Sequence, residues 1–308
     1  MAREPSAAPS GDVDMSQIDE RDVDERDLDE LDLDELDVDG RDVDGRDVDG
    51  RDVDEWGRSE RMCDLFHRAF DPVYRRWFRA RWEGLEHVPR SGGALLVANH
   101  AGAVPADGPV IVHGIEKEVG RPVHVLAAYT FWSMPVAGTI FARMGGVAAH
   151  PANAHRLLHE EGRLALVYPE GTKGTGKLLG ERYHLRRFGR GGFVETAMRA
   201  GVPVVPIAVV GSEEAMPIVY KNGALARALR VPYVPVTVNM LLFGPAGLLL
   251  FFPAKFHLRV LEPVTFDVAP EQDRYSTSMV MDEAEGIRER IQLALVDMLE
   301  SRKSIWFG

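Results

Sequence analysis

The sequence predicts an α/β domain in which a mostly parallel central sheet is flanked by helices, preceded by a disordered acidic tail. Three observations favour this architecture. Short apolar runs bounded by Gly or Pro recur along the chain, helical patterns separate them, and a charged repeat ends where they begin. Such alternation is typical of parallel sheets with helices on both faces. We therefore expect a tail over residues 1–57 and one domain over residues 58–308.

The tail is expected to be disordered because of its composition. Residues 11–55 consist largely of a five-residue repeat with units such as RDVDE, RDLDE, LDLDE and RDVDG. Residues 1–55 carry 23 acidic and 6 basic side chains, a net charge of −17, and the whole chain carries −12, which leaves +5 for the rest. A charge block without aromatic residues cannot bury enough apolar surface to offset chain entropy. The units also lack the further ligands of a calcium loop and the small inward residues of a pentapeptide β-helix.

Cysteine content and hydropathy indicate where the protein resides. A single cysteine, Cys63, excludes a disulfide framework and favours a reducing compartment. The polar, acidic N-terminus does not resemble a signal peptide. The most apolar stretch, LLFGPAGLLLFF at residues 241–252, is too short to span a bilayer and is interrupted by Gly and Pro. It is expected to enter one leaflet of a membrane, to line an acyl channel, or to form a plain core hairpin.

Residues 58–81 predict amphipathic N-terminal helices, because apolar side chains recur at steps of three and four. Asp71 and Pro72 are expected to divide this segment, as N-cap and first-turn residue of a second helix. Four arginines between residues 75 and 81 interleave with aromatic residues. This composition suits an anionic membrane interface, and equally an ordinary helix packed on the domain.

Strand and helix patterns then alternate to the end of the chain. In open sheets of this kind, active sites gather at the carboxyl ends of strands, where Asn99-His100 and Pro169-Glu170 are expected to lie. The expected strands are GALLVANH (93–100), VHVLAA (123–128), RLALVYP (163–169), VPVVPIAVVG (202–211) and FHLRVLEPV (256–264). The expected helices cover residues 108–119, 131–142, 153–161, 192–200 and 278–302.

The stretch YPEGTKGTGK at residues 168–177 fits the glycine–lysine half of a nucleotide-binding P-loop. A P-loop needs Ser or Thr after the lysine to hold magnesium, and a helix must begin there. Leu178 follows Lys177, and the next residues lack a clear helix start. We interpret the P-loop likeness as accidental.

His100 lies at the end of a predicted strand, seven residues before Asp107. A carboxylate beside a histidine fixes the ring tautomer and stabilises the imidazolium when the other nitrogen accepts a proton. No Gly-x-Ser-x-Gly elbow is present, and Cys63 lies in a helical run. The pair would therefore act directly on a substrate hydroxyl as a general base, although a lone His near an Asp is more often structural.

Four blocks resemble the glycerolipid (lysophospholipid) acyltransferase superfamily, in order, over nearly all of residues 80–265. The blocks are Asn99-His100 with Asp107, Gly145-Gly146, Tyr168 to Thr172, and Val202 to Pro206. The resemblance implies that His100, oriented by Asp107, deprotonates an acceptor hydroxyl that attacks the thioester of an acyl-CoA or acyl-carrier protein. It implies no metal and no bound cofactor. The residues that would bind substrate are Asn99, Glu170, Gly171, Thr172, Lys173 and Arg190.

Two features bear on the acceptor. Six residues separate His100 from Asp107, and this spacing, with the block from Arg190, is similar to the branch of diacylglycerol- and monoacylglycerol-type enzymes. The arginine that glycerophosphate-type members carry after the Gly-Gly block is missing, and His150 lies near that place, which favours a neutral glycerolipid or other lipid alcohol. Seven basic residues between Thr172 and Arg199 suit donor phosphates or lipid headgroups, or form a solvated loop.

We therefore expect a peripheral acyltransferase on the cytoplasmic face of a membrane. Its expected partners are an acyl thioester, a lipid acceptor and the membrane surface, and not nucleic acid. The alternatives are a lysophosphatidate-type enzyme acting on a phosphorylated acceptor, a lipid-binding protein without turnover, and a hydrolase of the same thioester. The sequence predicts neither the oligomeric state nor the role of the acidic tail.

Overall fold

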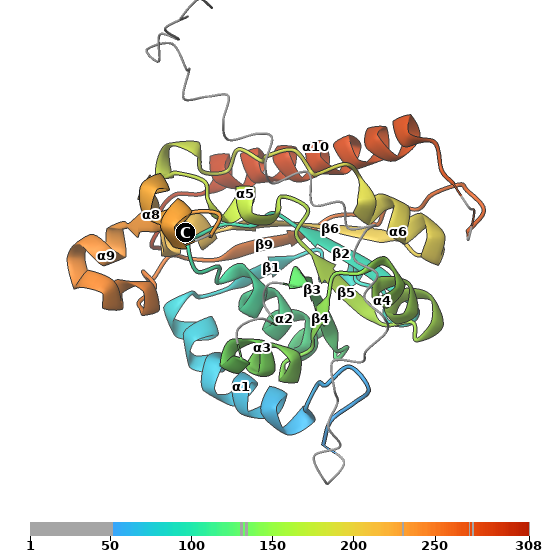
Figure 1. The fold of residues 1–308 in the computed structure, drawn as a ribbon, viewed down its shortest axis with the longest axis horizontal. Helices are drawn as coiled ribbons and strands as arrows, with labels where there is room; N and C mark the ends of the chain where they lie inside the picture. The colour runs from blue at the N-terminus through green and yellow to red at the C-terminus, as the bar shows by residue number, and fades with distance from the viewer. Residues whose placement is uncertain are drawn as a thin grey trace, which may run out of the picture. The chain divides into compact units, whose positions relative to one another are not determined.

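The central sheet has seven strands, which hydrogen-bond in the order β1-β9-β6-β2-β5-β3-β4 in this computed structural model (Figure 1). The strands from β6 to β4 in this order are parallel to one another, whereas β9 pairs antiparallel with β6 and parallel with β1. The predicted mostly parallel sheet is confirmed. The strands are β1 (Arg81–Glu83), β2 (Ala94–Ala98), β3 (Val123–Ala127), β4 (Gly146–Ala148), β5 (Leu164–Val167), β6 (Val204–Val210) and β9 (His257–Val260).

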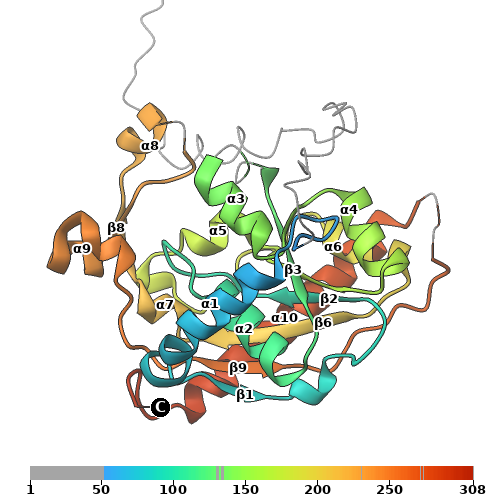
Figure 2. The ribbon, with the colours of Figure 1, turned by 90° about the horizontal axis from the view of Figure 1, so that it is seen from below.

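Helices cover both faces of this sheet, which explains why its central strands are apolar at every position. Alternate side chains of a strand point to opposite faces. Leu95 of β2 belongs to the core beneath α10, and the next residue, Leu96, belongs to the core beneath α2. Figures 1 and 2 show α10, α6 and α4 on one face and α1 and α2 on the other. The α-helices are α1 (Glu60–Pro72), α2 (Asp107–Glu118), α3 (Pro135–Arg143), α4 (Pro151–His155), α5 (Gly171–Thr175), α6 (Gly192–Ala200), α7 (Ser212–Ala215), α8 (Gly223–Leu229), α9 (Val238–Phe243) and α10 (Thr277–Ser301).

Shorter elements complete the domain. An antiparallel pair outside the main sheet is formed by β7 (Ile218–Lys221) and β8 (Pro235–Thr237). The π-helical segments are η1 (Val73–Trp77) and η4 (Arg156–Glu160). The 3-10 helices are η2 (Leu85–His87), η5 (Leu179–Glu181) and η6 (Gly244–Leu249).

The structure describes residues 52–129, 132, 135–229, 231–270, 272 and 274–307, which all fall within one compact unit, Asp49–Gly308. The predicted disorder of residues 1–51 lies outside these residues, as does the start of the helix expected at 131–142. Residues 52–57, which the prediction counted with the tail, pack on the domain. Asp54 pairs with Arg163 at 3.0 Å, and the Trp56 indole donates to Glu161 at 2.9 Å. Contacts with Arg163 and Glu161 of the domain thus hold these residues.

Two local predictions were wrong. The helix of residues 60–77 does not break at Asp71 and Pro72, because α1 continues directly into the π-helical turn η1. The Asp71 carboxylate does not cap a second helix because it binds His113 and Lys117 of α2 instead. Of the three alternatives for residues 241–252, the core hairpin is wrong, because they fold as the end of α9, then η6 and an extended segment. Most of their leucines and Phe243 are exposed, whereas Phe251 packs against the core beneath α2. Within the part of the chain that the structure describes, we find no helix with the length and apolar character needed to cross a bilayer.

Candidate active site

The predicted catalytic residues meet where three neighbouring parallel strands end. Because β6, β2 and β5 are adjacent and parallel, their carboxyl ends lie at the same edge of the sheet. His100 follows β2, Glu170 follows β5 and Ser212 follows β6. We call the residues that meet here the active-site corner. They are His100, Asp107, Tyr168, Glu170, Gly174, Lys177, Ser212 and Glu213.

The His100 ring is held by Asp107. The His100 Nδ1 atom lies 3.1 Å from each carboxylate oxygen of Asp107. A carboxylate can only accept, so Nδ1 carries the proton and Nε2 presents a lone pair. Among the described residues none hydrogen-bonds to Nε2, and the side chain keeps 16% of its surface exposed. Asp107 thus fixes the ring tautomer and leaves Nε2 available to accept a proton, as a general base requires.

Asp107 is fully buried, and it is stabilised as an anion by N–H groups rather than by a cation. It is the first residue of α2, where the helix dipole favours negative charge. Its oxygens accept from the backbone N–H of Ala101 at 2.9 Å and of Gly108 at 2.7 Å. The Ser212 hydroxyl lies 3.4 Å from one oxygen and donates to the Ala101 carbonyl at 2.9 Å. The Asp107 carboxylate thus binds both His100 and the backbone of Ala101, at the start of the loop that connects the two catalytic candidates.

Tyr168 and Gly174 fix the position of the imidazole from the β5 side. The Tyr168 ring stacks on His100 with centroids 3.9 Å apart and an angle of 18°. Burial raises the pKa of the Tyr168 hydroxyl well above its usual value, so this ring stays neutral. A Cβ at Gly174 would lie 2.8 Å from the His100 carbonyl oxygen, so only glycine allows α5 to approach this closely.

A buried ion cluster supports the histidine backbone. Glu170 accepts from the backbone N–H of His100 at 3.2 Å and of Arg186 at 2.8 Å. Lys177 lies between two carboxylates, 3.4 Å from Glu170 and 3.0 Å from Glu213. Burial raises the pKa of Glu213, and Lys177 opposes that rise. A lysine buried in this way cannot reach a nucleotide phosphate, which agrees with the rejection of a P-loop.

Asn99 has a different place from the one expected of a substrate-binding residue. It is fully buried, its amide donates to the Val209 carbonyl at 3.0 Å, and its oxygen accepts from the Val209 N–H at 2.8 Å. Both ends of the side chain are therefore used to tie the end of β2 to β6. Glu170 is likewise buried and acts on His100 through the backbone.

The other residues expected to bind substrate are exposed. Gly171, Thr172 and Lys173 lie on α5, directly after Glu170. Arg190 is exposed in the turn before α6. His150 is the N-cap of α4, and its Nδ1 accepts from the Ala152 N–H at 3.2 Å.

The predicted basic patch is smaller than its sequence suggests. Lys177 is buried, Arg186 pairs with Glu181 at 2.5 Å, and Arg199 pairs with Glu195 at 2.8 Å. Among the described residues, no group of three or more His, Cys, Asp or Glu side chains is placed so that it could hold a metal ion.

Sequence reasoning missed the supporting role of Tyr168, Gly174, Ser212 and the Lys177–Glu213 pair. Tyr168 and Gly174 lie in or beside a block that the sequence analysis had quoted, so their position was a usable signal. Ser212 and Glu213 follow β6, more than a hundred residues after His100, and no local pattern marks them.

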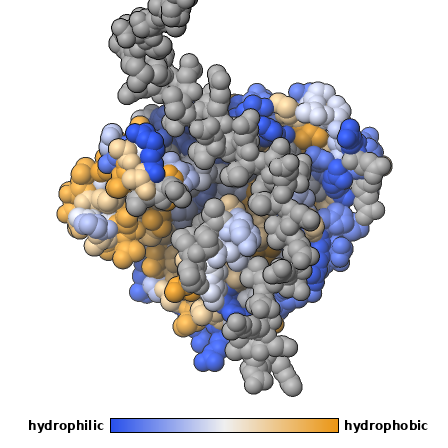
Figure 3. Space-filling model, in the orientation of Figure 1, coloured by the Kyte–Doolittle hydropathy of each residue, from blue (hydrophilic) through white to orange (hydrophobic). Residues whose placement is uncertain are grey.

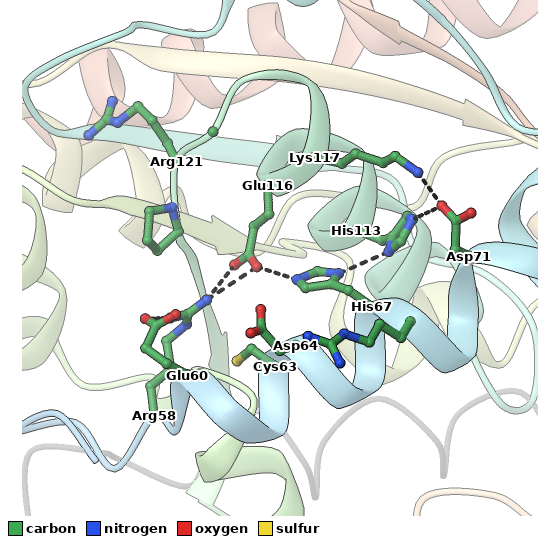
Figure 4. A pocket seen from close by; sticks show the side chains of 13 residues that line it. Arg58, Glu60, Cys63, Asp64, His67, Asp71, His113, Glu116, Lys117 and Arg121 are labelled. Carbon is green, nitrogen blue, oxygen red and sulfur yellow. Dashed lines mark hydrogen bonds and ion pairs between the residues drawn. The ribbon is translucent and has the colours of Figure 1, made fainter. Parts of the chain in front are cut away.

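A second set of histidines and carboxylates lies in a pocket of about 570 Å³ between α1 and α2 (Figure 4). His67 Nδ1 and His113 Nδ1 are 2.9 Å apart, and His67 Nε2 lies 2.7 Å from Glu116. Burial lowers the pKa of His113, whereas the hydrogen bond from Lys117 lowers the pKa of Asp71 to about 2. Arg58 completes the set through Glu116, at 3.2 Å. We call Arg58, His67, Asp71, His113, Glu116 and Lys117 the α1–α2 cluster.

Comparison with known proteins gives three findings. The family model described as Acyltransferase matches residues 79–210. An uncharacterized protein of Mycobacterium tuberculosis is 40% identical over 238 residues, which cover 76% of this chain and 66% of that protein. The bovine protein described as "DGAT1/2-independent enzyme synthesizing storage lipids" is 21% identical over 238 residues, covering 74% of this chain and 67% of that protein. The chain thus spans about two thirds of the length of these relatives.

Among solved structures, the crystal structure of the 1-acyl-sn-glycerophosphate acyltransferase PlsC from Thermotoga maritima is similar to this chain. It has a TM-score of 0.49 and 18% sequence identity, and the match covers 79% of this chain and 81% of that one.

Proposed function

Because the chain belongs to the acyltransferase family through its domain at residues 79–210, we propose that it transfers a fatty acyl group from an acyl thioester to a hydroxyl of a lipid acceptor. One observation carries the proposal. His100 is bound through Nδ1 to a fully buried carboxylate, and none of the described residues hydrogen-bonds to its Nε2. This arrangement leaves a base directed at a substrate rather than at the protein.

In the proposed reaction, Nε2 of His100 takes the proton of the acceptor hydroxyl as its oxygen attacks the thioester carbonyl carbon. Asp107 stabilises the imidazolium that forms. The carbon–sulfur bond then breaks, an ester forms, and the proton passes from the imidazolium to the departing thiolate. The donor is acyl-CoA or an acyl-carrier protein, and the transfer needs no oxidant, reductant or metal.

A direct transfer is supported by the absence of a suitable nucleophile in the corner. The Ser212 hydroxyl beside the pair is buried, donates to the Ala101 carbonyl at 2.9 Å and lies 3.4 Å from an Asp107 oxygen. Cys63 lies on α1, and burial raises the pKa of its thiol to about 11. A covalent acyl-enzyme is disfavoured on Ser212 because its hydroxyl is buried and bonded to the protein, and on Cys63 because its thiol stays protonated.

We propose a neutral glycerolipid as the acceptor. The missing arginine after Gly146 and the use of His150 as a helix cap leave that place without a fixed cation for a phosphate. The relative described as synthesizing storage lipids supports the same choice. Because acceptor and product are lipids, we also propose that the enzyme works peripherally at the cytoplasmic face of a membrane.

The test is acceptor-dependent thiol release from palmitoyl-CoA, with lipid products identified by mass. The acceptors are glycerol 3-phosphate, lysophosphatidate, monoacylglycerol and diacylglycerol, dispersed in detergent. Wild type, His100→Ala and the matched surface variant His184→Ala are compared, since His184 is exposed and its ring contacts only a nearby carbonyl. We expect release with a neutral acceptor that only His100→Ala loses.

Other outcomes separate the alternatives. Preference for lysophosphatidate would identify the phosphorylated-acceptor enzyme, and release without any lipid acceptor would identify a thioesterase. No release by wild type would overturn the proposal in favour of a lipid-binding protein, and equal release by wild type and His100→Ala would overturn the role of His100.

A further inference from the structure

One surface of the domain is apolar where a protein surface is usually polar. Leu241, Leu242 and Phe243 of α9 are more than half exposed, and Leu249 and Leu250 at the end of η6 are also exposed. In Figure 3 apolar residues gather over α9. Single exposed apolar residues are ordinary, whereas a contiguous group of large ones marks an interaction site.

The side of α9 that faces the domain is polar and buried, and its apolar side chains therefore face outward. Thr237 caps α9 by accepting from the Met240 N–H at 3.1 Å. The fully buried Asn239 amide donates to the carbonyls of Leu250, at 2.5 Å, and Ala215, at 3.3 Å. An ordinary surface helix has the reverse arrangement, with its apolar side facing the core.

Aromatic residues from both ends of the domain extend this surface. The Arg79 guanidinium donates to four backbone carbonyls, those of Arg76 at 3.4 Å, Trp77 at 2.6 Å, Pro253 at 2.6 Å and Trp306 at 2.5 Å. The Trp77 indole donates to the Phe251 carbonyl at 3.0 Å. These bonds join residues 73–82, 238–256 and 301–307 into one body, which we call the docking surface. Its exposed aromatic residues are Phe243, Trp77, Trp306 and Phe307.

The docking surface carries one sign of charge. Its three segments contain seven Arg and Lys residues and no Asp or Glu. Asp71 and Glu83 lie just outside it and pair with Arg75 and Arg81, and Arg302 is largely buried beside Glu214, at 3.0 Å. This arrangement matches the layers of an anionic bilayer. Leucine and phenylalanine suit the acyl chains, tryptophan suits the interface, and arginine and lysine suit the anionic headgroups.

We propose that the docking surface inserts α9 and η6 into the acyl layer of an anionic membrane, with its arginines and lysines at the phosphates. The inference rests on the proposed function, because it supplies the route to a lipid acceptor. Asn239 binds the carbonyl of Ala215, the last residue of α7, and α7 begins at Ser212 in the active-site corner. The helix α7 therefore contacts α9 through Ala215 and Asp107 through Ser212.

The experiment is vesicle flotation of the full chain, with phosphatidylcholine alone and with phosphatidylcholine mixed with phosphatidylglycerol. Leu241→Ser/Leu242→Ser is compared with Leu293→Ser/Val296→Ser. The first two leucines are 67% and 64% exposed, and the control residues on α10 are 69% and 44% exposed. We expect the α9 variant to lose about tenfold to a hundredfold in binding to the mixed vesicles, and the control variant to bind like wild type.

Charge is tested separately by Arg76→Glu/Lys255→Glu. This variant should lose binding to the mixed vesicles, and salt should weaken wild-type binding in the same way. Equal binding by the α9 and control variants would overturn the proposal. So would a wild-type dimer that Leu241→Ser/Leu242→Ser converts to a monomer without lipid, since the surface would then join two copies of the chain.

Failure of the docking surface is distinguishable from failure of the catalytic proposal. His100→Ala should float like wild type although it has no turnover. Leu241→Ser/Leu242→Ser should retain thiol release with acceptor dispersed in detergent. Loss of both properties in the α9 variant, with an unchanged circular dichroism spectrum, would contradict a separate docking role.

Discussion

The active-site corner and the α1–α2 cluster both pair histidine with carboxylate, yet they are built in opposite ways. In the corner, Asp107 is fully buried, and its partners are N–H groups of the backbone, one imidazole and, at 3.4 Å, the Ser212 hydroxyl. In the α1–α2 cluster, Asp71 is partly exposed and is shared by His113, Lys117 and Arg75. Among the described residues, no cation pairs with Asp107 until His100 is protonated.

This difference determines what each histidine can do. His100 has one nitrogen bound to Asp107, and no described residue hydrogen-bonds to the other, so a proton taken from a substrate would create an ion pair in a largely buried place. His113 has both nitrogens engaged, one with His67 and one with Asp71. The α1–α2 cluster can therefore join α1 to α2, but it has no free ring nitrogen at His113 for a substrate.

The largest expected contrast is in turnover. His100→Ala should lower acyl transfer by about 10²–10⁴-fold, the usual contribution of a general base. His113→Ala should leave kcat close to wild type, because its effect is confined to helix packing. Thiol release at saturating acceptor checks both variants, and a comparable loss in His113→Ala would break the contrast.

The next contrast is in stability and concerns two lysines. Lys177 is 1% exposed between two carboxylates, and Lys117 is 28% exposed beside Asp71. Lys177→Met should lower the free energy of unfolding by about 3–5 kcal/mol, because it leaves Glu170 and Glu213 buried without a cation. Lys117→Met should lower it by about 0–1 kcal/mol. Urea denaturation of both variants measures the difference, and equal losses would contradict the burial argument.

Substitution of the two aspartates sharpens the comparison further. Asp107→Asn should lower kcat by about a hundredfold to a thousandfold, because an amide neither stabilises the imidazolium nor accepts from all of its present donors. The cation-neutralised Asp71 should tolerate Asn with little change in rate. Thiol release by the two variants at saturating acceptor measures the difference, and a loss in Asp71→Asn as large as in Asp107→Asn would contradict it.

The smallest effect is a pH dependence of stability in the α1–α2 cluster. Burial lowers the folded-state pKa of His113, so the unfolded chain binds a proton more readily than the folded one. The stability that neutral His113 contributes is present above its ordinary pKa of about 6.5 and is lost as the pH falls below it. Protonation would also place a second charge against His67 and Lys117, while Asp71, with its pKa near 2, stays ionised.

The free energy of unfolding should therefore fall between pH 7.5 and pH 5.5, and His113→Gln should remove about 1 kcal/mol or less of that fall. Urea midpoints at the two pH values measure it. An unchanged pH dependence in His113→Gln would show that other histidines carry it.

The sheet was predictable because its strands are buried on both faces. Runs such as Ala94–Ala98 and Val204–Val210 are apolar at every position and end at Gly, Pro or Asn. The family resemblance and the placement of His100 beside Asp107 came from short-range motifs, and the structure brings those two residues together. Strand β1 was not predicted, because Arg81–Glu83 has no strand pattern of its own and pairs only with a segment 176 positions later.

The supporting residues of the site were not predictable for a related reason. One anion partner of Lys177 is Glu213, and Asn99 binds the backbone of Val209. Both pairings join residues far apart in the sequence, so no local spacing predicts them. The break expected at Asp71 followed a sound local rule, but contacts with α2 compete for the capping carboxylate. Local sequence patterns therefore predict most helices and strands among the described residues. Tertiary contacts decide the roles of individual polar side chains.

The bonds of Arg79 also have a consequence for the order in which the proposed docking surface is assembled. One of its four carbonyl partners belongs to Trp306, 227 positions further along the chain. Contacts between segments so far apart form late, since the intervening chain must be closed first. During synthesis Trp77, Arg79 and α9 are made before Trp306 and Phe307. The proposed docking surface is therefore complete only after residues 301–307 have been made.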